Sequence, residues 1–539
     1  FSVDNTSLRN EGKIPTGLNY IKELGVNYIQ LMPVYDYASV NEDGTGAQFN
    51  WGYDPKNYNV PEGSYATDPS DPENRIREVK TMVQKLHDAG LNLVMDVVYN
   101  HLYDGQNNPF EYTVPGYYYA INRDGKMNND VGVGNAVRSN SEMMRQYIVN
   151  SVAYWAMEYG MDGFRFDAMS DLDVKTMKAV REAINKIDPN IVTYGEGWDS
   201  MGKYLEKDGD KPASVGNAKD TPEVGYFDSV GRDSIAGSHY DNGNPPGFVN
   251  RQSDYKHDEG KIKTLVDSLM GGHGRSFANA SQQLNYVEVH DGMTLSDLLK
   301  HYNPNDTEEE HMNRVELATA MSALSQGIHF SQHGQEFLRS KSNSHNTYNA
   351  GDEKNKIDWG LVNKNADAVN FTKSLISLRK NEPLWHLSDY QKEIFKHMKI
   401  TNAQKGSGIV TYELTKENGD RYLAVFNNNT SPDNNSSLTL GGNSYYYGSD
   451  KSRGDINDFS NAYVVATNSK NLYDKIGKAN GSKTITMDKL SATILYIPKA
   501  KITNKSVVRE TIRYVNTNGE TVSPDKVQET TRVTVQQTD

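Results

Sequence analysis

Four apolar segments of the chain each end in polar side chains that can carry acid–base chemistry. These residues are Asp96, Asn100 and His101 after the first segment, Arg165 and Asp167 after the second, Glu196 and Trp198 after the third, and His290 and Asp291 after the fourth. A single polar residue in such a place is commonly a helix N-cap. Four matching places favour one shared site. Cleavage of a glycosidic acetal needs a proton donor and a carboxylate at the anomeric carbon, so the set predicts glycoside transfer without a redox cofactor.

The neighbours of each carboxylate suggest how the roles are divided. Asp167 lies two residues from Arg165, and a nearby cation favours the ionised form that a nucleophile needs. Glu196 lies in an apolar, aromatic stretch near Trp198, where a raised pKa suits a proton donor. The third carboxylate, Asp291, is then available to bind sugar hydroxyls, whose positions change as the sugar ring flattens in the transition state.

The elements that position these residues follow from an alternation of patterns between residue 14 and about 380. Helical patterns cover 16–25, 72–90, 141–160, 174–187 and 313–326, and apolar strand patterns cover 26–34, 91–101, 161–167, 190–196, 283–291 and 327–336. Continuous apolar strands between helices are typical of parallel strands buried on both faces. The number of units favours an α/β fold of the (β/α)8 TIM-barrel type, whose catalytic face lies at the carboxyl ends of the strands.

The composition and hydrophobic pattern of the sequence change twice after the predicted barrel, near residues 383 and 500. Two alternating runs around the "NGD" turn at 418–420 predict a hairpin, and the region 383–499 reads as an antiparallel β-sandwich domain. We therefore expect a catalytic barrel over 1–382 with a small inserted loop region at 101–135. Residues 500–539, rich in Thr, Val and charge, are expected to be a linker and the start of a possible surface-protein repeat.

Bulk composition excludes several classes of function. The 539 residues carry a net charge of −13, which argues against a nucleic-acid partner. The absence of Cys excludes disulfides, thiolate metal sites and Cys nucleophiles. No apolar run approaches the roughly 18 residues that a membrane span requires.

The four polar segments resemble, in order and spacing, the four conserved regions of the α-amylase superfamily, glycoside hydrolase family 13. The resemblance covers residues 1 to about 499. It implies that Asp167 is the nucleophile, Glu196 the acid/base and Asp291 the transition-state stabiliser. By the same resemblance, Asp96, His101, Arg165, Trp198 and His290 are substrate-binding residues, several of them around the −1 sugar.

Two further stretches resemble type I pullulanases within that superfamily. "FNWGYDP" at 49–55 is similar to their "YNWGYDP" signature, which implies that Tyr53 stacks beneath the −1 glucose. "NTYNAGDEKNKIDW" at 346–359 is similar to the loop on their −2 side and implies that Asn346, Tyr348 and Asp352 bind substrate. The implied reaction is hydrolysis of α-1,6 bonds in pullulan, amylopectin, glycogen and limit dextrins. An α-1,4-acting amylase or neopullulanase, or a non-catalytic glycan-binding surface protein, remains as an alternative.

The resemblance also carries expectations about the surroundings of the chain. The family's first barrel strand is missing except for "FS" at the start, so we expect a fragment whose signal peptide and anchor lie elsewhere. "IRYVNTNGETVSPDKV" at 512–527 is similar to repeats of Gram-positive surface proteins, which implies a secreted or cell-surface enzyme. We expect an α-glucan polysaccharide as partner, a monomer, and no required cofactor or metal, with Ca²⁺ possible.

Overall fold

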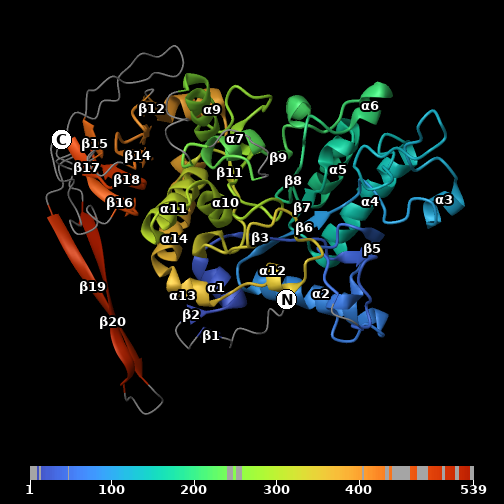
Figure 1. The fold of residues 1–539 in the computed structure, drawn as a ribbon, viewed down its shortest axis with the longest axis horizontal. Helices are drawn as coiled ribbons and strands as arrows, with labels where there is room; N and C mark the ends of the chain where they lie inside the picture. The colour runs from blue at the N-terminus through green and yellow to red at the C-terminus, as the bar shows by residue number, and fades with distance from the viewer. Residues whose placement is uncertain are drawn as a thin grey trace. The chain divides into compact units, whose positions relative to one another are not determined.

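Figure 1 shows the fold of the computed structural model. It describes residues 9–10, 14–45, 48–239, 247–250, 258–403, 406–430, 436–439, 462–469, 484–499, 504–515 and 521–534. The chain divides into two compact units, one of residues 1–396 with 405–408 and one of residues 397–404 with 409–539. The division therefore lies a little after the limit at 382 expected from the change in composition and pattern.

A curled sheet of parallel strands is the centre of the first unit (Figure 1). Its members in the described residues are β3 (Tyr28–Leu31), β6 (Asn92–Val97), β7 (Gly163–Phe166), β8 (Val192–Gly195), β9 (Gly225–Phe227), β10 (Gln283–Asn285) and β11 (Ile328–His329). Each strand pairs in parallel with the strand of this sheet that follows it in the sequence. The parallel, TIM-barrel-like arrangement that the sequence predicts is confirmed, and β3 and β11 are the two edges of the described sheet.

Helices connect these strands and shield the sheet (Figure 1). The longer ones are α1 (Gly17–Leu24), α2 (Pro72–Asp88), α4 (Glu142–Tyr159), α5 (Val174–Ile187), α7 (Ser229–Ile235), α9 (Glu259–Leu269), α10 (Leu295–Tyr302), α11 (Glu308–Leu324) and α14 (Ala366–Asn381). Short helices are α3 (Pro109–Thr113), α6 (Lys203–Lys207), α12 (Asp352–Asn355), α13 (Gly360–Lys364) and α15 (Phe395–His397). Local signals set the ends: Asp71 caps α2, and Gly25 ends α1 in the left-handed conformation.

The strands are shorter than the apolar patterns that predict them. The pattern at 283–291 yields only β10, because its neighbours β9 and β11 are themselves three and two residues long and give no further ladder. His290 and Asp291 therefore stand on the loop after β10 and not at the strand's end. Strand β9 and helices α7, α9, α10 and α14 are additions to the predicted set.

Two antiparallel pairs flank the sheet in the first unit. They are β1 (Arg9–Asn10) with β2 (Ile14–Pro15), and β4 (Tyr35–Tyr37) with β5 (Pro55–Pro61). The second pair brackets the "FNWGYDP" stretch, whose end overlaps the start of β5. This pairing places Pro55, the last residue of the stretch, opposite Tyr37.

The second unit is antiparallel, as predicted. Strands β12 (Met398–Asn402), β13 (Ile409–Thr415), β14 (Arg421–Asn427), β16 (Tyr463–Thr467) and β18 (Ser491–Ile497) form one sheet, and β15 (Ser436–Thr439) and β17 (Thr484–Met487) form another. Leu423, Val425 and Leu495 of the first sheet share a core with Ile485 and Met487 of the second. Residues 500–539, expected to be a linker, contain a long hairpin of β19 (Asn504–Val515) and β20 (Thr521–Thr534).

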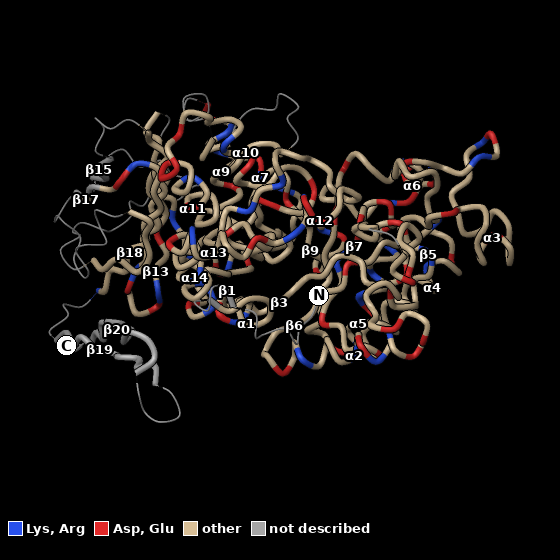
Figure 2. The backbone as a smooth tube through the Cα atoms, turned by 60° about the horizontal axis from the view of Figure 1, so that its bottom comes forward, with Lys and Arg blue, Asp and Glu red and all other residues tan. Residues whose placement is uncertain are grey.

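Charges of both signs are mixed along the described helices and loops (Figure 2). Helix α2 is an example, since Arg77 pairs with both Asp71 and Glu73 on its surface. Such exposed pairs contribute little to stability, because water and salt screen their charges. Among the described residues, no helix combines the length and apolar character needed to cross a bilayer.

Candidate active site

Arg165 joins three carboxylates at the carboxyl ends of three adjacent strands. Its Nη1 donates to both oxygens of Asp96, at 2.9 and 3.1 Å, and to Oδ1 of Asp167 at 2.9 Å. Its Nη2 lies 2.6 Å from Oε1 of Glu196. The arginine side chain is 2% exposed. Strands β6, β7 and β8, which pair in parallel register, thus bring one cation and three carboxyl groups together.

Asp167 is held on both of its carboxylate oxygens. While Oδ1 accepts from Arg165, Oδ2 accepts from Nδ2 of Asn100 at 2.8 Å. The same Asn100 nitrogen also donates to the backbone oxygen of Asp167 at 2.8 Å. The backbone N–H of Asp167 donates to the carbonyl of Val97 at 2.9 Å, which ties this aspartate to the end of β6.

The residue after Asp167 has an unusual backbone. Ala168 has φ 40° and ψ 47°, the left-handed region that non-glycine residues rarely adopt. Its N–H donates to Oε2 of Glu196 at 3.0 Å. Strain of this kind persists only where the surroundings over-determine it, and here it turns a backbone donor toward the second carboxylate.

Glu196 is a carboxyl group whose surroundings favour the protonated form. Burial raises its pKa to about 8, the charges of Asp167 and Asp291 add to the rise, and Arg165 opposes it. A carboxylic acid that keeps its proton near neutral pH is able to protonate a leaving group. The physical environment therefore matches the proton-donor role predicted from the sequence.

An aromatic stack borders the carboxylates. The Tyr53 hydroxyl donates to Oδ2 of Asp96 at 2.7 Å, and its ring lies parallel to that of His290, with centroids 5.2 Å apart and planes at 16°. The guanidinium of Arg165 lies 5.7 Å from the Tyr53 ring centroid. Burial lowers the pKa of His290 to about 4, so this imidazole is neutral at physiological pH.

His101 is the second buried imidazole of the site and is 4% exposed. Its Nδ1 lies 2.5 Å from Oδ1 of Asn100, the residue that also binds Asp167. Burial lowers the pKa of His101, while the charge of Asp167 opposes that shift. The structure therefore brings His101 into the same group as Asp96, Arg165 and Asp167.

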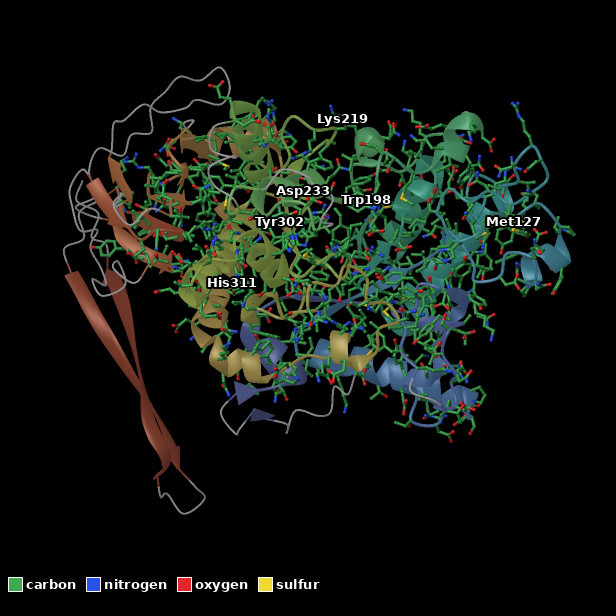
Figure 3. All side chains as sticks on the ribbon, in the orientation of Figure 1. Met127, Trp198, Lys219, Asp233, Tyr302 and His311 are labelled. Carbon is green, nitrogen blue, oxygen red and sulfur yellow. The ribbon has the colours of Figure 1, made fainter. Side chains whose placement is uncertain are left out.

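Asp291 and Trp198 complete a small cavity over these residues. The cavity is lined by Gln30, Arg165, Glu196, Trp198, Phe227, Arg232, Tyr286, Val289, His290, Asp291 and Phe330. The Asp291 side chain is 41% exposed, and its Oδ2 lies 3.6 Å from Nε2 of His290. Trp198 lies beside the end of β8, far from Met127 of the inserted loop region (Figure 3). Asp291 is thus more accessible to solvent than Asp167 and Glu196, whose side chains are 18% and 13% exposed.

The predicted loop at 346–359 joins the site through one tryptophan. The backbone N–H of Trp51 donates to the carbonyl of Tyr348 at 3.0 Å, and its Nε1 donates to Oδ1 of Asn355 at 3.2 Å. The side chains of Asn346, Tyr348 and Asp352 are exposed. None of these three side chains has a described contact with the catalytic carboxylates, so their predicted substrate contacts stay predictions.

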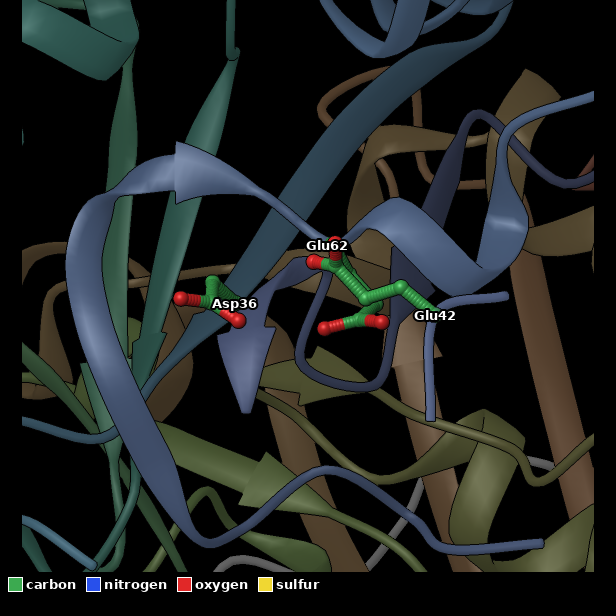
Figure 4. Close-up of side chains that lie close together, drawn as sticks. All are labelled: Asp36, Glu42 and Glu62. Carbon is green, nitrogen blue, oxygen red and sulfur yellow. The ribbon is translucent and has the colours of Figure 1, made fainter. Parts of the chain in front are cut away.

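Three carboxylates outside this site also gather: Asp36, Glu42 and Glu62, with oxygens within 4.8 Å of one another (Figure 4). Each already has protein partners. Glu42 binds both terminal nitrogens of Arg75 at 2.7 Å. Glu62 accepts from two backbone N–H groups, and Asp36 accepts from Asn57. These partners account for the cluster through protein contacts alone, and it carries no assignment as a metal site.

Some members of the site are not evident from the sequence. Asn100 is visible there as a polar strand-end residue, but nothing in the sequence indicates that it donates to the backbone oxygen and to Oδ2 of Asp167 and also contacts His101. Ala168 looks like a small spacer, although its strained backbone donates to Glu196. Trp51 stands in the "FNWGYDP" stretch, and only the fold reveals that it links this stretch to the 346–359 loop.

The chain is similar to known proteins along most of its length. Residues 12–131 match the family "Alpha amylase, catalytic domain". Among curated proteins, pullulanase of Bacillus subtilis strain 168 is 36% identical over 404 residues, which are 74% of this chain and 54% of that protein. The chain thus spans about half the length of this relative.

Solved structures give the same result for the fold. The pullulanase of Paenibacillus barengoltzii in complex with maltohexaose and α-cyclodextrin superposes with a TM-score of 0.78 at 33% identity, covering 92% of this chain and 72% of that one. The pullulanase of Anoxybacillus sp. LM18-11 complexed with maltotetraose gives a TM-score of 0.78 at 34% identity, covering 90% and 66%. From the site and these relatives together, the chain belongs to the pullulanase family of the α-amylase superfamily.

Proposed function

We propose that this protein hydrolyses α-1,6-glucosidic bonds in pullulan and branched α-glucans by a retaining double displacement. The observation that carries the proposal is the arrangement around Arg165, which holds Asp167 and Glu196 on two different nitrogens of one guanidinium. Retaining glycosidases need a nucleophile and an acid/base about 5–5.5 Å apart. Two groups anchored on neighbouring nitrogens are compatible with that spacing.

In the first step, Oδ of Asp167 attacks the anomeric carbon while Glu196 gives its proton to the departing glycosidic oxygen. The C–O bond to the leaving sugar breaks, and an ester bond to Asp167 forms. In the second step, Glu196, now ionised, takes a proton from a water molecule whose oxygen attacks the same carbon and releases Asp167. Asp291 binds ring hydroxyls as the sugar flattens toward the transition state.

The local environment supports this division of roles. Glu196 has a raised pKa, because its burial outweighs the opposing effects of Arg165 and of the Ala168 N–H, whereas Asp167 accepts hydrogen bonds from Arg165 and Asn100. Neutral His290 and His101 donate hydrogen bonds to sugar hydroxyls without adding charge. No group outside this set is needed for proton transfer, so no cofactor is required.

The choice of α-1,6 bonds rests on Tyr53, Trp198 and the 346–359 loop. A branch point presents two glucan chains at an angle. Tyr53 stacks beneath the −1 glucose, and Trp198 contacts the second glucan chain. The loop that carries Asn346, Tyr348 and Asp352 lines the binding site of the chain on the non-reducing side. The pullulanases among the relatives, several solved with maltooligosaccharides, support this choice.

We also propose that the protein acts as a monomer at the surface of a Gram-positive bacterium. The surface-repeat resemblance at 512–527 and the bacterial pullulanases among the relatives support this location. Fractionation of cells with an antibody to the chain tests it. A purely cytosolic signal would contradict it.

Product analysis on pullulan tests the bond specificity. The purified full chain is incubated with pullulan and, separately, with linear amylose, and the products are separated by chromatography. We expect maltotriose from pullulan and little release from amylose. Panose from pullulan with rapid amylose cleavage would indicate an α-1,4 enzyme, and tight glucan binding without any release would indicate a binding protein.

A further inference from the structure

Lys341 is a buried cation directly behind the predicted substrate-binding histidine. It lies on the loop between β11 and α12, in the sequence "FLRSKSNS", and is 2% exposed. Its Nζ donates to the backbone carbonyl of His290 at 2.7 Å. A lysine in a loop is usually exposed, because burying an ammonium group costs several kcal/mol unless it is compensated.

A single carboxylate fixes the turn that carries Lys341. Asp297 of α10 accepts from the backbone N–H of Lys341 at 2.7 Å and from that of Asn343 at 3.1 Å on one oxygen. Its other oxygen accepts from the hydroxyl of Ser340 at 2.5 Å. Three hydrogen bonds to one buried carboxylate leave this turn little freedom.

An aromatic ring closes the arrangement from the other side. Nζ of Lys341 lies 5.7 Å from the Trp51 ring centroid, within the range of a cation–π contact. The Trp51 ring in turn meets the ring of His290 edge-on, with centroids 5.0 Å apart and planes at 85°. His290 is thus held through its carbonyl by Lys341 and through its ring by Trp51 and Tyr53.

The charge of Lys341 has no ion-pair partner among the residues that the structure describes. Its Nζ is compensated by one carbonyl, one aromatic face and the more distant carboxylates of Glu288, Asp291 and Asp297. A structural lysine would gain more from a direct carboxylate contact. Direct donation to His290, next to Asp291, points to a role in placing those two residues.

We propose that Lys341 is a positioning residue for glycosidic cleavage, which holds the His290–Asp291 turn against Trp51 and Tyr53 so that both side chains meet the −1 sugar in the transition state. This inference rests on the proposed function for its catalytic consequence. Lys341 itself does not touch the substrate, because it is buried behind His290. Its loss therefore displaces groups that act in the transition state and leaves most ground-state binding in place.

The variant Lys341→Met tests this role, since methionine keeps the apolar stem and removes the donor. The matched control is Lys364→Met, at the exposed end of α13. We expect kcat on pullulan to fall about 100-fold in Lys341→Met, as misplacement by about 1 Å does, with KM changed less than threefold. Hydrogen exchange followed by mass spectrometry should show faster exchange in the peptide that contains 288–293, and Lys364→Met should match the wild type in both measurements.

A milder variant serves if Lys341→Met does not fold. Asp297→Asn keeps the shape of the anchor and weakens its hold on the turn, so kcat should fall about tenfold. If Lys341→Met does fold and both residues act through the same turn, the double variant loses less than the product of the two single losses. Fully multiplicative losses, a rise in KM at constant kcat, or unchanged exchange at 288–293 would each overturn the proposal.

The two proposals fail in different ways. If the wild-type chain releases nothing from pullulan, the proposed function fails, while the exchange measurement still decides whether Lys341 holds the 288–293 segment. If the wild type is active and Lys341→Met keeps kcat within threefold, the positioning role is wrong and the proposed function stands.

Discussion

Replacing Asp167 by Asn separates the chemistry of the site from its stability. The amide is isosteric, so Oδ1 still accepts from Arg165, but the new NH₂ group faces Nδ2 of Asn100, which is also a donor. Asn100 is not free to turn around, because its Oδ1 contacts His101. The mismatch of two donors costs about 1–3 kcal/mol.

A second effect works in the opposite direction. Asp96 and Asp167 share the single cation of Arg165, so their negative charges repel each other in the wild type. Removing one negative charge relieves part of that repulsion and offsets the donor mismatch. We therefore expect the free energy of unfolding to change by no more than about 2 kcal/mol, which is a shift in Tm below about 8 °C.

The catalytic effect is much larger than the effect on stability. An amide is a poor nucleophile, and removal of a nucleophile typically lowers kcat by a factor on the order of 10⁴–10⁶, or about 5–8 kcal/mol in the barrier. The assay is release of reducing ends from pullulan, with calorimetry on the same sample and Asp124→Asn, an exposed turn aspartate, as control. Activity within tenfold of the wild type would refute the role of Asp167, and a collapse of Tm would show that the loss came from unfolding.

Three other residues give independent predictions. Burial raises the pKa of Glu196 to about 8, so the stability that its protonated form contributes is complete below the unfolded value of about 4.3 and is lost as pH rises through about 8. The inactive variant Glu196→Gln resembles the protonated form at every pH. In calorimetry, the Tm of this variant minus that of the wild type should therefore increase from pH 5 to pH 9. A difference in Tm that stays constant would contradict this. For the same reason, kcat/KM of the wild type should fall above pH about 8. Trp198→Ala should raise KM for pullulan about 3–10-fold through lost stacking, with little change in kcat; an unchanged KM would place Trp198 outside the substrate path. At Ala168, φ 40° predicts that Ala168→Gly keeps or raises Tm whereas Ala168→Val lowers it, and equal Tm values would mean that the backbone is unstrained.

The sequence predicts the barrel well because its signals are local and repeated. The strand predicted at 161–167 is observed as β7 (Gly163–Phe166), and the capped helix predicted at 72–90 is observed as α2 (Pro72–Asp88). Such periodic segments bury a continuous apolar face wherever they pack. Short strands are harder: β9 has only three residues, too few for a period to be visible, and β11 keeps only two residues of the pattern at 327–336.

The same difference between local and non-local signals applies to the residues of the site. Asp96 and Arg165 are register partners within β6 and β7, and Asp167 and Glu196 directly follow β7 and β8, so parallel pairing brings the four residues together. His290 and Asp291 are in the site, but a loop and not a strand carries them. Lys341 is far from all of these in sequence, and its burial depends on Asp297 and Trp51, which no local pattern connects to it.

The guanidinium of Arg165 constrains the distance between Asp167 and Glu196. Its nitrogens are held at fixed distances by resonance, and Asp167 and Glu196, which come from two different strands, each bind a different one. The spacing between Oδ1 of Asp167 and Oε1 of Glu196 is therefore constrained by a rigid planar group, and we expect small shifts between β7 and β8 to change it little. Heating, or exchange of residues in the surrounding helices, should then erode the barrel's stability well before it alters the catalytic spacing. The outer layers of this fold are free to diverge while the reaction stays the same.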